Sequence, residues 1–138
     1  MGLILDSSIL IAAERKGLDD LEILEQLKVF YGETAFGLSV VTIAELMHGA
    51  YRAKEEARKQ RRLAFIDRLC REIRIYPITV EIARALGRIE GQLASQGFTL
   101  AFEDLAIGVT ALHLGFEIVT HNEKDFKLIP GLRIVKPK

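Results

Sequence analysis

Three acidic residues that are far apart in the sequence each stand beside an apolar segment that should be buried. Asp6 follows the apolar run "LIL", Glu45 lies within "TIAEL", and Asp104 is near the start of "EDLAIGVTALHLG". A buried charge is costly unless it is paired or binds a metal. If the three carboxylates meet in a partly dry cleft they repel one another, and a divalent cation would remove that repulsion. An all-oxygen donor set suits Mg²⁺, with Mn²⁺ as a substitute.

Two further polar residues could join these acids. Asn122 and Asp125 lie in "THNEKDF", directly after a short apolar stretch. Zinc is a poor alternative, because His48, His113 and His121 have no partner at the spacing of zinc ligands. The residue types therefore favour a magnesium site over a zinc site.

Each acid also has a simpler interpretation as part of a helix terminus. Thr42 and Glu45 fit a capping box. Asp104 could favour the positive end of its own helix dipole, and Asp6 could cap a helix that begins at Ser8. Three separate caps would not explain why three acids gather at strand ends, so we favour one shared site.

The elements that would position these residues alternate between strand and helix. The apolar pattern predicts five strands, at residues 2–5, 36–41, 73–77, 116–120 and 132–136. Between them it predicts six helices, at residues 8–15, 18–30, 42–57, 56–73, 79–96 and 103–115.

Short strands that are apolar on both faces and alternate with helices indicate a parallel sheet covered by helices. We expect a single three-layer α/β domain over residues 1–138, with no linker and about five strands. In such sheets the functional crevice lies beyond the carboxyl ends of the strands. The acids, Asn122 and Asp125 would then meet at one edge of the sheet.

Bulk composition narrows the class of protein further. No apolar stretch is long enough for a membrane span, and the N-terminus does not look like a signal peptide. The single cysteine, Cys70, rules out an internal disulfide, fits a reducing cytoplasm and is interpreted as a buried, inert thiol.

The net charge is zero, but residues 52–74 hold nine Lys or Arg against four acids, which permits a polyanion partner. The leucine-rich segment 18–30 with Phe36 offers a surplus of apolar surface, as in a homodimer interface.

Three blocks of the sequence resemble the signature blocks of PIN-domain ribonucleases, most closely the VapC toxins of type II toxin–antitoxin modules. They are "LILDSSILIAA", "SVVTIAEL.HG" and "GFTLAFEDLAIGVTALHLGFEIVTHNEKDFKLIPGLRIV". The last is the most specific, because its glycines, acid, apolar helix and "PGL" all fall in register. The resemblance implies a PIN-like fold, Mg²⁺-dependent endonuclease activity on RNA, products with a 5′-phosphate and a 3′-hydroxyl, and a cognate antitoxin as partner.

The resemblance also assigns roles to individual residues. Asp6, Glu45 and Asp104 match the three acids of the family's metal site. Ser8 and Thr120 match two hydroxyls of that site.

Two positions depart from the family pattern. Asn122 stands where many relatives have a fourth acid, and Asp125 could compensate or could only cap the next turn. Glu103 is an additional acid beside Asp104, and only one of these neighbours should face the metal, since adjacent helical residues point about 100° apart.

Two other classes of function compete with a nuclease. A phosphoacceptor signalling domain also has acids at parallel-strand ends, but it needs an acidic pair after the first strand, where this chain has Asp6 followed by two serines. A catalytically inactive PIN-like binding module is the other alternative, and the intact set of three acids argues against it.

Overall fold

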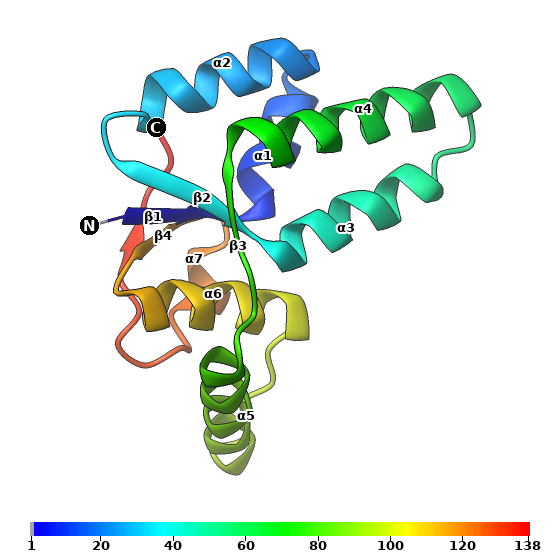
Figure 1. Ribbon diagram of the computed structural model, residues 1–138. Coiled ribbons are helices and arrows are strands. Elements are labelled where there is room, and N and C mark those ends of the chain that lie inside the picture. Colours follow the sequence, from blue (N-terminus) through cyan, green and yellow to red (C-terminus); the bar gives the residue numbers. More distant parts are fainter. Residues whose placement is uncertain (1) are drawn as a thin grey trace.

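A five-stranded parallel sheet forms the centre of the molecule (Figure 1), which is described over residues 2–138 by a computed structural model. The strands lie in the order β3-β2-β1-β4-β5, so the first strand of the chain is the central strand of the sheet. Their bounds are β1 Gly2–Leu5, β2 Ala35–Ser39, β3 Arg74–Tyr76, β4 Glu117–Val119 and β5 Ile134–Val135. The sequence prediction of a parallel α/β fold with five strands is confirmed.

Seven helices connect and cover the strands. They are α1 Ser7–Arg15, α2 Asp20–Tyr31, α3 Val40–Tyr51, α4 Glu56–Glu72, α5 Val80–Ser95, α6 Phe102–Leu114 and α7 Glu123–Phe126. Five of them match predicted helices within two residues at each end. The predicted helix 42–57 is too long, because α3 ends at Tyr51, and the single turn α7 has no counterpart among the predicted helices. None of the helices in residues 2–138 is both long and apolar enough to cross a bilayer.

The sheet separates two hydrophobic cores, because side chains alternate between its faces. Leu3 and Leu5 of β1 point into a core shared with α1, α2 and α4. Ile4, between them, points into the core formed with α5 and α6. Figure 1 shows the two groups of helices on opposite sides of the sheet. The fold is therefore the three-layer arrangement that the strands' two-sided apolar character predicts.

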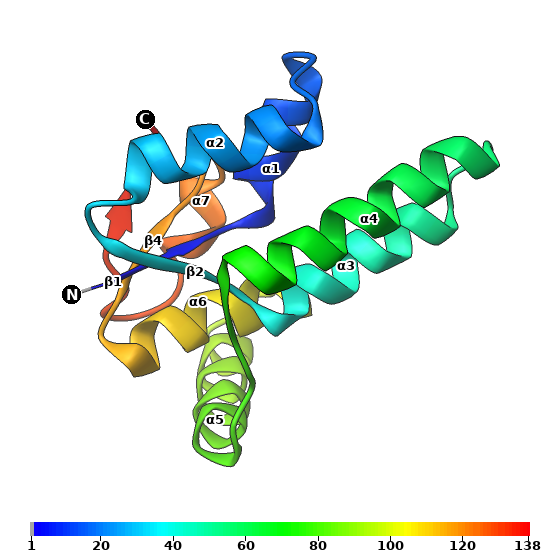
Figure 2. The same ribbon diagram turned by 45° about the horizontal axis from the view of Figure 1, so that its top comes forward.

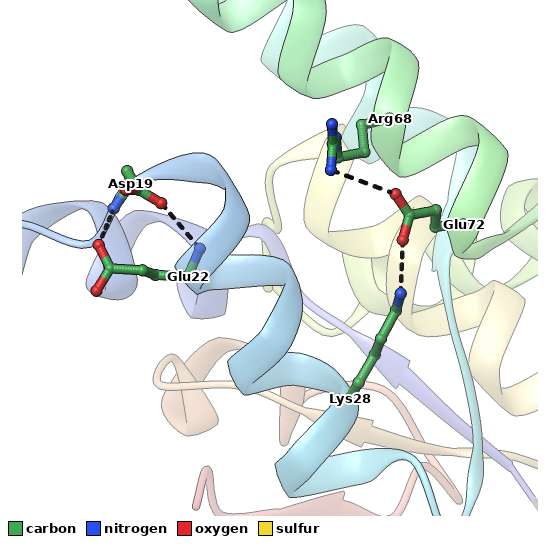
Figure 3. A network of polar contacts seen from close by, with 5 residues as sticks. All are labelled: Asp19, Glu22, Lys28, Arg68 and Glu72. Atoms are coloured by element: carbon green, nitrogen blue, oxygen red, sulfur yellow. Dashed lines mark hydrogen bonds and ion pairs between the residues drawn. The ribbon is translucent and has the colours of Figure 1, made fainter.

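Helices α3 and α4 pack against each other and form an arm that projects away from the sheet (Figure 2). Arg62 of α4 donates to the main-chain oxygen of Gly49 in α3 at 3.1 Å and lies 3.7 Å from the carboxylate of Glu14 in α1. Where α4 returns to the body, Glu72 accepts from Lys28 of α2 and lies 3.9 Å from Arg68 (Figure 3). These contacts anchor the middle and the C-terminal end of α4.

A capping box fixes the start of α2, as Figure 3 also shows. The Asp19 side chain accepts from the main-chain N–H of Glu22 at 2.9 Å, and the Glu22 side chain accepts from the N–H of Asp19. α2 then turns Leu24 and Leu27 into the core, leaving Leu21 (55% exposed) and Val29 (75% exposed) outside.

The surplus of apolar surface expected over residues 18–30 and at Phe36 is therefore smaller than the sequence suggests. Phe36 is partly buried against the core on the side of α1, α2 and α4. Most of the leucines in residues 18–30 also pack in or against this core. Homodimer formation stays a prediction, with less apolar surface in this segment to support it.

Two local predictions are wrong. α3 begins at Val40 rather than at Thr42, because the side chain of Ser39 accepts from the N–H of Val41 and caps the helix three residues earlier. Cys70 is exposed rather than buried, because the core-facing positions of α4 near it are Ile66 and Leu69, and Cys70 follows Leu69 about 100° around the helix.

Candidate functional site

Asp6 lies where the two central strands end, and nearly all of its surface is buried. The register pairs Leu5 with Val119, so the next residues, Asp6 and Thr120, leave the sheet side by side. Asp6 is 3% exposed, and its Oδ2 accepts from the hydroxyl of Thr120 at 2.8 Å. Its Oδ1 has no hydrogen-bond partner. A buried carboxylate oxygen without a donor is costly in a folded protein, and a cation is one group that would satisfy it.

The prediction that Asp6 caps α1 is wrong. Asp6 stands at the N-cap position of α1, but its side chain makes no capping hydrogen bond. The carboxylate turns to Thr120 instead. Its carboxylate is therefore bound to the residue that follows β4, at the carboxyl end of the sheet, rather than to α1.

The loop after β4 holds a small network of hydroxyl and amide groups around Asp6. Besides donating to Asp6, Thr120 Oγ1 accepts from the main-chain N–H of Asn122 at 2.8 Å. Ser8 Oγ lies 3.4 Å from Thr120 Oγ1 and accepts from the N–H of His121 at 3.1 Å. The two hydroxyl residues predicted for the site, Ser8 and Thr120, thus lie together beside Asp6.

Glu45 lies in the second turn of α3, half-buried, with its Oε1 unpartnered. Burial and then the charges of Asp6 and Asp104 raise the pKa of Glu45 to about 7, against a smaller opposing effect of a hydrogen bond from Ser7. The capping-box interpretation of Glu45 is wrong, because Ser39 caps α3 and the Thr42 hydroxyl has no partner.

Asp104 lies in the first turn of α6, half-buried. Burial first, and then the charges of Asp6, Asp125 and Glu103, raise its pKa to about 6. Glu103 is exposed whereas Asp104 is not, which agrees with the expectation that only one of these neighbours turns inward. The position of Asp104 in the first turn is also compatible with a favourable interaction with the helix dipole.

Asn122 and Asp125 contact each other. The amide Nδ2 of Asn122 donates to Asp125 Oδ2 at 2.8 Å. Because Asp125 also contributes to the raised pKa of Asp104, α7 adds a fourth carboxylate to the electrostatic environment of the acids.

Gly108 allows α6 to lie very close to the segment that follows Asp125. A Cβ at this position would come within 2.3 Å of Ile129 and 3.2 Å of Phe126. Gly108 is one turn beyond Asp104, so the same close packing that buries Phe126 holds α7 against the Asp104 end of α6.

Sequence reasoning missed two contributors to this site. Ser7 bonds Glu45, while Ser8 lies beside Thr120, since consecutive helical residues point about 100° apart. The adjacency of Ser7 and Ser8 to Asp6 was the available signal. The close approach at Gly108 had no such signal, because a helical glycine in an apolar helix does not reveal its partner.

The chemistry of the donor set fits a hard divalent cation. Two carboxylate oxygens, one on Asp6 and one on Glu45, are buried without a donor. Burial and then repulsion from neighbouring acids raise the pKa values of Glu45 and Asp104. Within residues 2–138, no three or more His, Cys, Asp or Glu side chains are drawn together into a ready metal-binding group. Carboxylates that repel one another separate, and a cation would draw them together.

Comparison with known proteins gives a consistent result. The family model for the PIN domain matches residues 3–132. The chain is 33% identical to ribonuclease VapC1 of Rickettsia felis over 98% of this chain and 96% of that protein. It is 29% identical to the tRNA(fMet)-specific endonuclease VapC of Salmonella typhimurium over 70% of this chain and 71% of that protein. The fold matches a chain in the crystal structure of VapBC2 from Rickettsia felis bound to a promoter DNA fragment, with a TM-score of 0.82, 23% identity and full coverage of both chains.

Proposed function

Since this chain belongs to the PIN domain family, with ribonuclease VapC proteins as its relatives, we propose that it is a metal-dependent endoribonuclease and the toxin of a toxin–antitoxin pair. The observation that carries the proposal is that Asp6 and Glu45 each have a buried carboxylate oxygen without a donor, while the charges of Asp6 and Asp104 act on Glu45. The reaction is the hydrolysis of an RNA phosphodiester bond.

Asp6, Glu45 and Asp104 would hold the cation, which we take to be Mg²⁺, with Mn²⁺ able to substitute. Bound there, a divalent cation supplies positive charge to neutralise the scissile phosphate and activates water for attack. Thr120 holds the Asp6 carboxylate in place, and Ser8 supports Thr120. Glu45, whose pKa is raised to about 7, would also orient the attacking water.

RNA contacts are proposed for the arm formed by α3 and α4. Arg52, Lys54 and Arg58 line a hollow of about 500 Å³ at its far end. Arg52 follows Glu45 by seven residues, which is about 10 Å along a helix at about 1.5 Å per residue. A single strand of RNA crossing the acids could therefore reach these cations, which would offset the repulsion between phosphates and the acidic site.

The same proposal covers the partners and the compartment. The relatives' names and the VapBC2 complex support an RNA substrate and a cognate antitoxin for this chain. We propose a homodimer as its own assembly state, and the cytoplasm as the place where it meets RNA and keeps its single cysteine reduced.

The test is cleavage of a single-stranded or looped RNA by the purified protein. We expect cleavage with Mg²⁺ or Mn²⁺, none with EDTA, and none by the D104N variant. The matched control is E103Q, which removes the exposed neighbouring carboxylate and should retain most of the activity. Equal cleavage in EDTA, or by D104N, would exclude the proposed metal site.

A further inference from the structure

Asn122 uses its donors to hold other groups of the site. Its main-chain N–H donates to the Thr120 hydroxyl, which in turn donates to Asp6. Its side-chain amide donates to Asp125 at 2.8 Å. Although Asn122 occupies the N-cap position of α7, its side chain makes no capping hydrogen bond there. One residue thus connects the central acid of the site to the carboxylate on α7.

Asp125 is held by Asn122 and its charge acts on Asp104. Its Oδ2 is fixed by Asn122, and its charge acts on Asp104 across the packed surfaces of α6 and α7. The Asp6 oxygen that lacks any donor belongs to a residue that is only 3% exposed, and it is an independent sign that this region accommodates a cation. The carboxylate nearest to this region on α7 thus belongs to Asp125, whereas residue 122 carries an amide.

We propose that Asn122 is a positioning residue that orients the Asp125 carboxylate toward the metal site, and that Asp125 rather than residue 122 supplies the site's fourth acid. The inference rests on the proposed function, because it assumes a cation among the acids. The proposal predicts that an acid placed at residue 122 weakens metal binding rather than strengthening it. The N122D variant replaces the amide that donates to Asp125 with a second carboxylate. The two carboxylates should repel each other and move apart.

The experiment measures Mn²⁺ affinity directly, by electron paramagnetic resonance of free Mn²⁺, without any RNA. Loss of a group that orients a metal ligand typically weakens metal affinity by about 10–100-fold. We expect weakening of about tenfold for D125N and for N122A, and at least as much for N122D. The matched control is E123Q, which removes a carboxylate from the same helix turn, where Glu123 faces Lys127 at 3.7 Å, and should bind Mn²⁺ within about twofold of wild type.

The N122D/D125N double variant separates positioning from general structural support. It restores one carboxylate and one amide at hydrogen-bond distance, so its melting temperature in EDTA should match that of wild type. Its carboxylate lies at residue 122, however, so its Mn²⁺ affinity should stay weak. Recovery of wild-type Mn²⁺ affinity in the double variant, or tighter binding by N122D, would overturn the inference.

Mn²⁺ binding by the wild-type protein separates failure of the metal-site proposal from failure of the role given to Asp125. Wild type that binds no Mn²⁺ even at millimolar concentration would overturn the metal-site proposal, and with it this inference. Wild type that binds Mn²⁺ while D125N binds equally well would leave the nuclease proposal intact and overturn only the role of Asp125.

Discussion

Removal of the Glu45 charge should stabilise the protein when no cation is present. The E45Q variant keeps the size and the hydrogen-bonding oxygen of the side chain but cannot ionise. Burial and the charges of Asp6 and Asp104 raise the pKa of Glu45 from 4.5 to about 7. The native state therefore holds this proton more tightly than the unfolded chain does, and native stability falls as the pH rises between those two values.

The size of the destabilisation by Glu45 follows from the change in its pKa. A change from 4.5 to about 7 corresponds to about 3 kcal/mol at about 1.4 kcal/mol per unit. Glu45 is only half-buried, so solvent screening reduces the destabilisation to about 1–2 kcal/mol. For a chain of this length that is about 3–6 °C in melting temperature. The penalty is fully present above about pH 7 and nearly absent below about pH 4.5.

The assay is a series of thermal melts in EDTA between about pH 4.5 and about pH 8, a range that spans both pKa values. E45Q should melt with wild type at the acidic end and progressively above it as the pH rises. The control is E25Q, which neutralises an exposed glutamate on α2 and should follow wild type at every pH. Millimolar Mg²⁺ should raise the wild-type melting temperature and reduce or reverse the advantage of E45Q, because a ligand that binds the folded state stabilises it. An advantage of E45Q that does not vary with pH would refute the electrostatic explanation.

Three further predictions concern other parts of the molecule. T120V should lower the free energy of unfolding in urea titrations by about 1–3 kcal/mol, because it leaves Asp6 Oδ2 without its donor, whereas T120S should stay close to wild type. The second prediction concerns single-stranded RNA bound by the D104N protein in EDTA. Adding R52A/R58A should reduce the magnitude of the slope of log affinity against log salt by about 1.4. This corresponds to about 0.7 for each of the two phosphates that are no longer neutralised. The control is the exposed α5 pair R84A/R88A, and an unchanged slope in R52A/R58A would exclude the arm as an RNA-binding surface. Sedimentation at tens of micromolar (about the range of a modest interface) should show a dimer, and a pure monomer would contradict the homodimer.

The sequence predicts the sheet and the meeting of the acids because both depend on strong, local patterns. Short two-sided apolar strands require helices on both faces, and parallel strands bring Asp6 and Thr120 to one edge. The start of α3 is less determined, since Ser39 and Thr42 are both good caps and the apolar Val40 and Val41 continue the strand pattern. Tertiary packing selects Ser39, and this moves Glu45 from the first turn to the second and removes its capping role.

The relation between Asn122 and Asp125 could not be predicted from spacing. The sequence allows either residue to serve as the fourth acid or the cap, and α7 is a single turn, too short for any periodic pattern. The close packing of Phe126 and Ile129 against Gly108 and the hydrogen bond from Asn122 both hold Asp125 in its place. The burial of Cys70 is wrongly predicted for a related reason, because the general tendency of cysteine to be buried takes no account of the helix phase set by Leu69.

The central position of β1 has a consequence for the time at which activity can arise during synthesis. β1 is synthesised more than 110 residues before β4, so its second edge stays unpaired and Asp6 lacks the Thr120 hydroxyl until β4 has followed. The acid on α6 and the loop that orients Asp125 also belong to the last third of the chain. A nascent or prematurely terminated chain therefore has Asp6 and Glu45 but no assembled site. A nuclease built in this order has no assembled site until α6, β4 and α7 have all been synthesised.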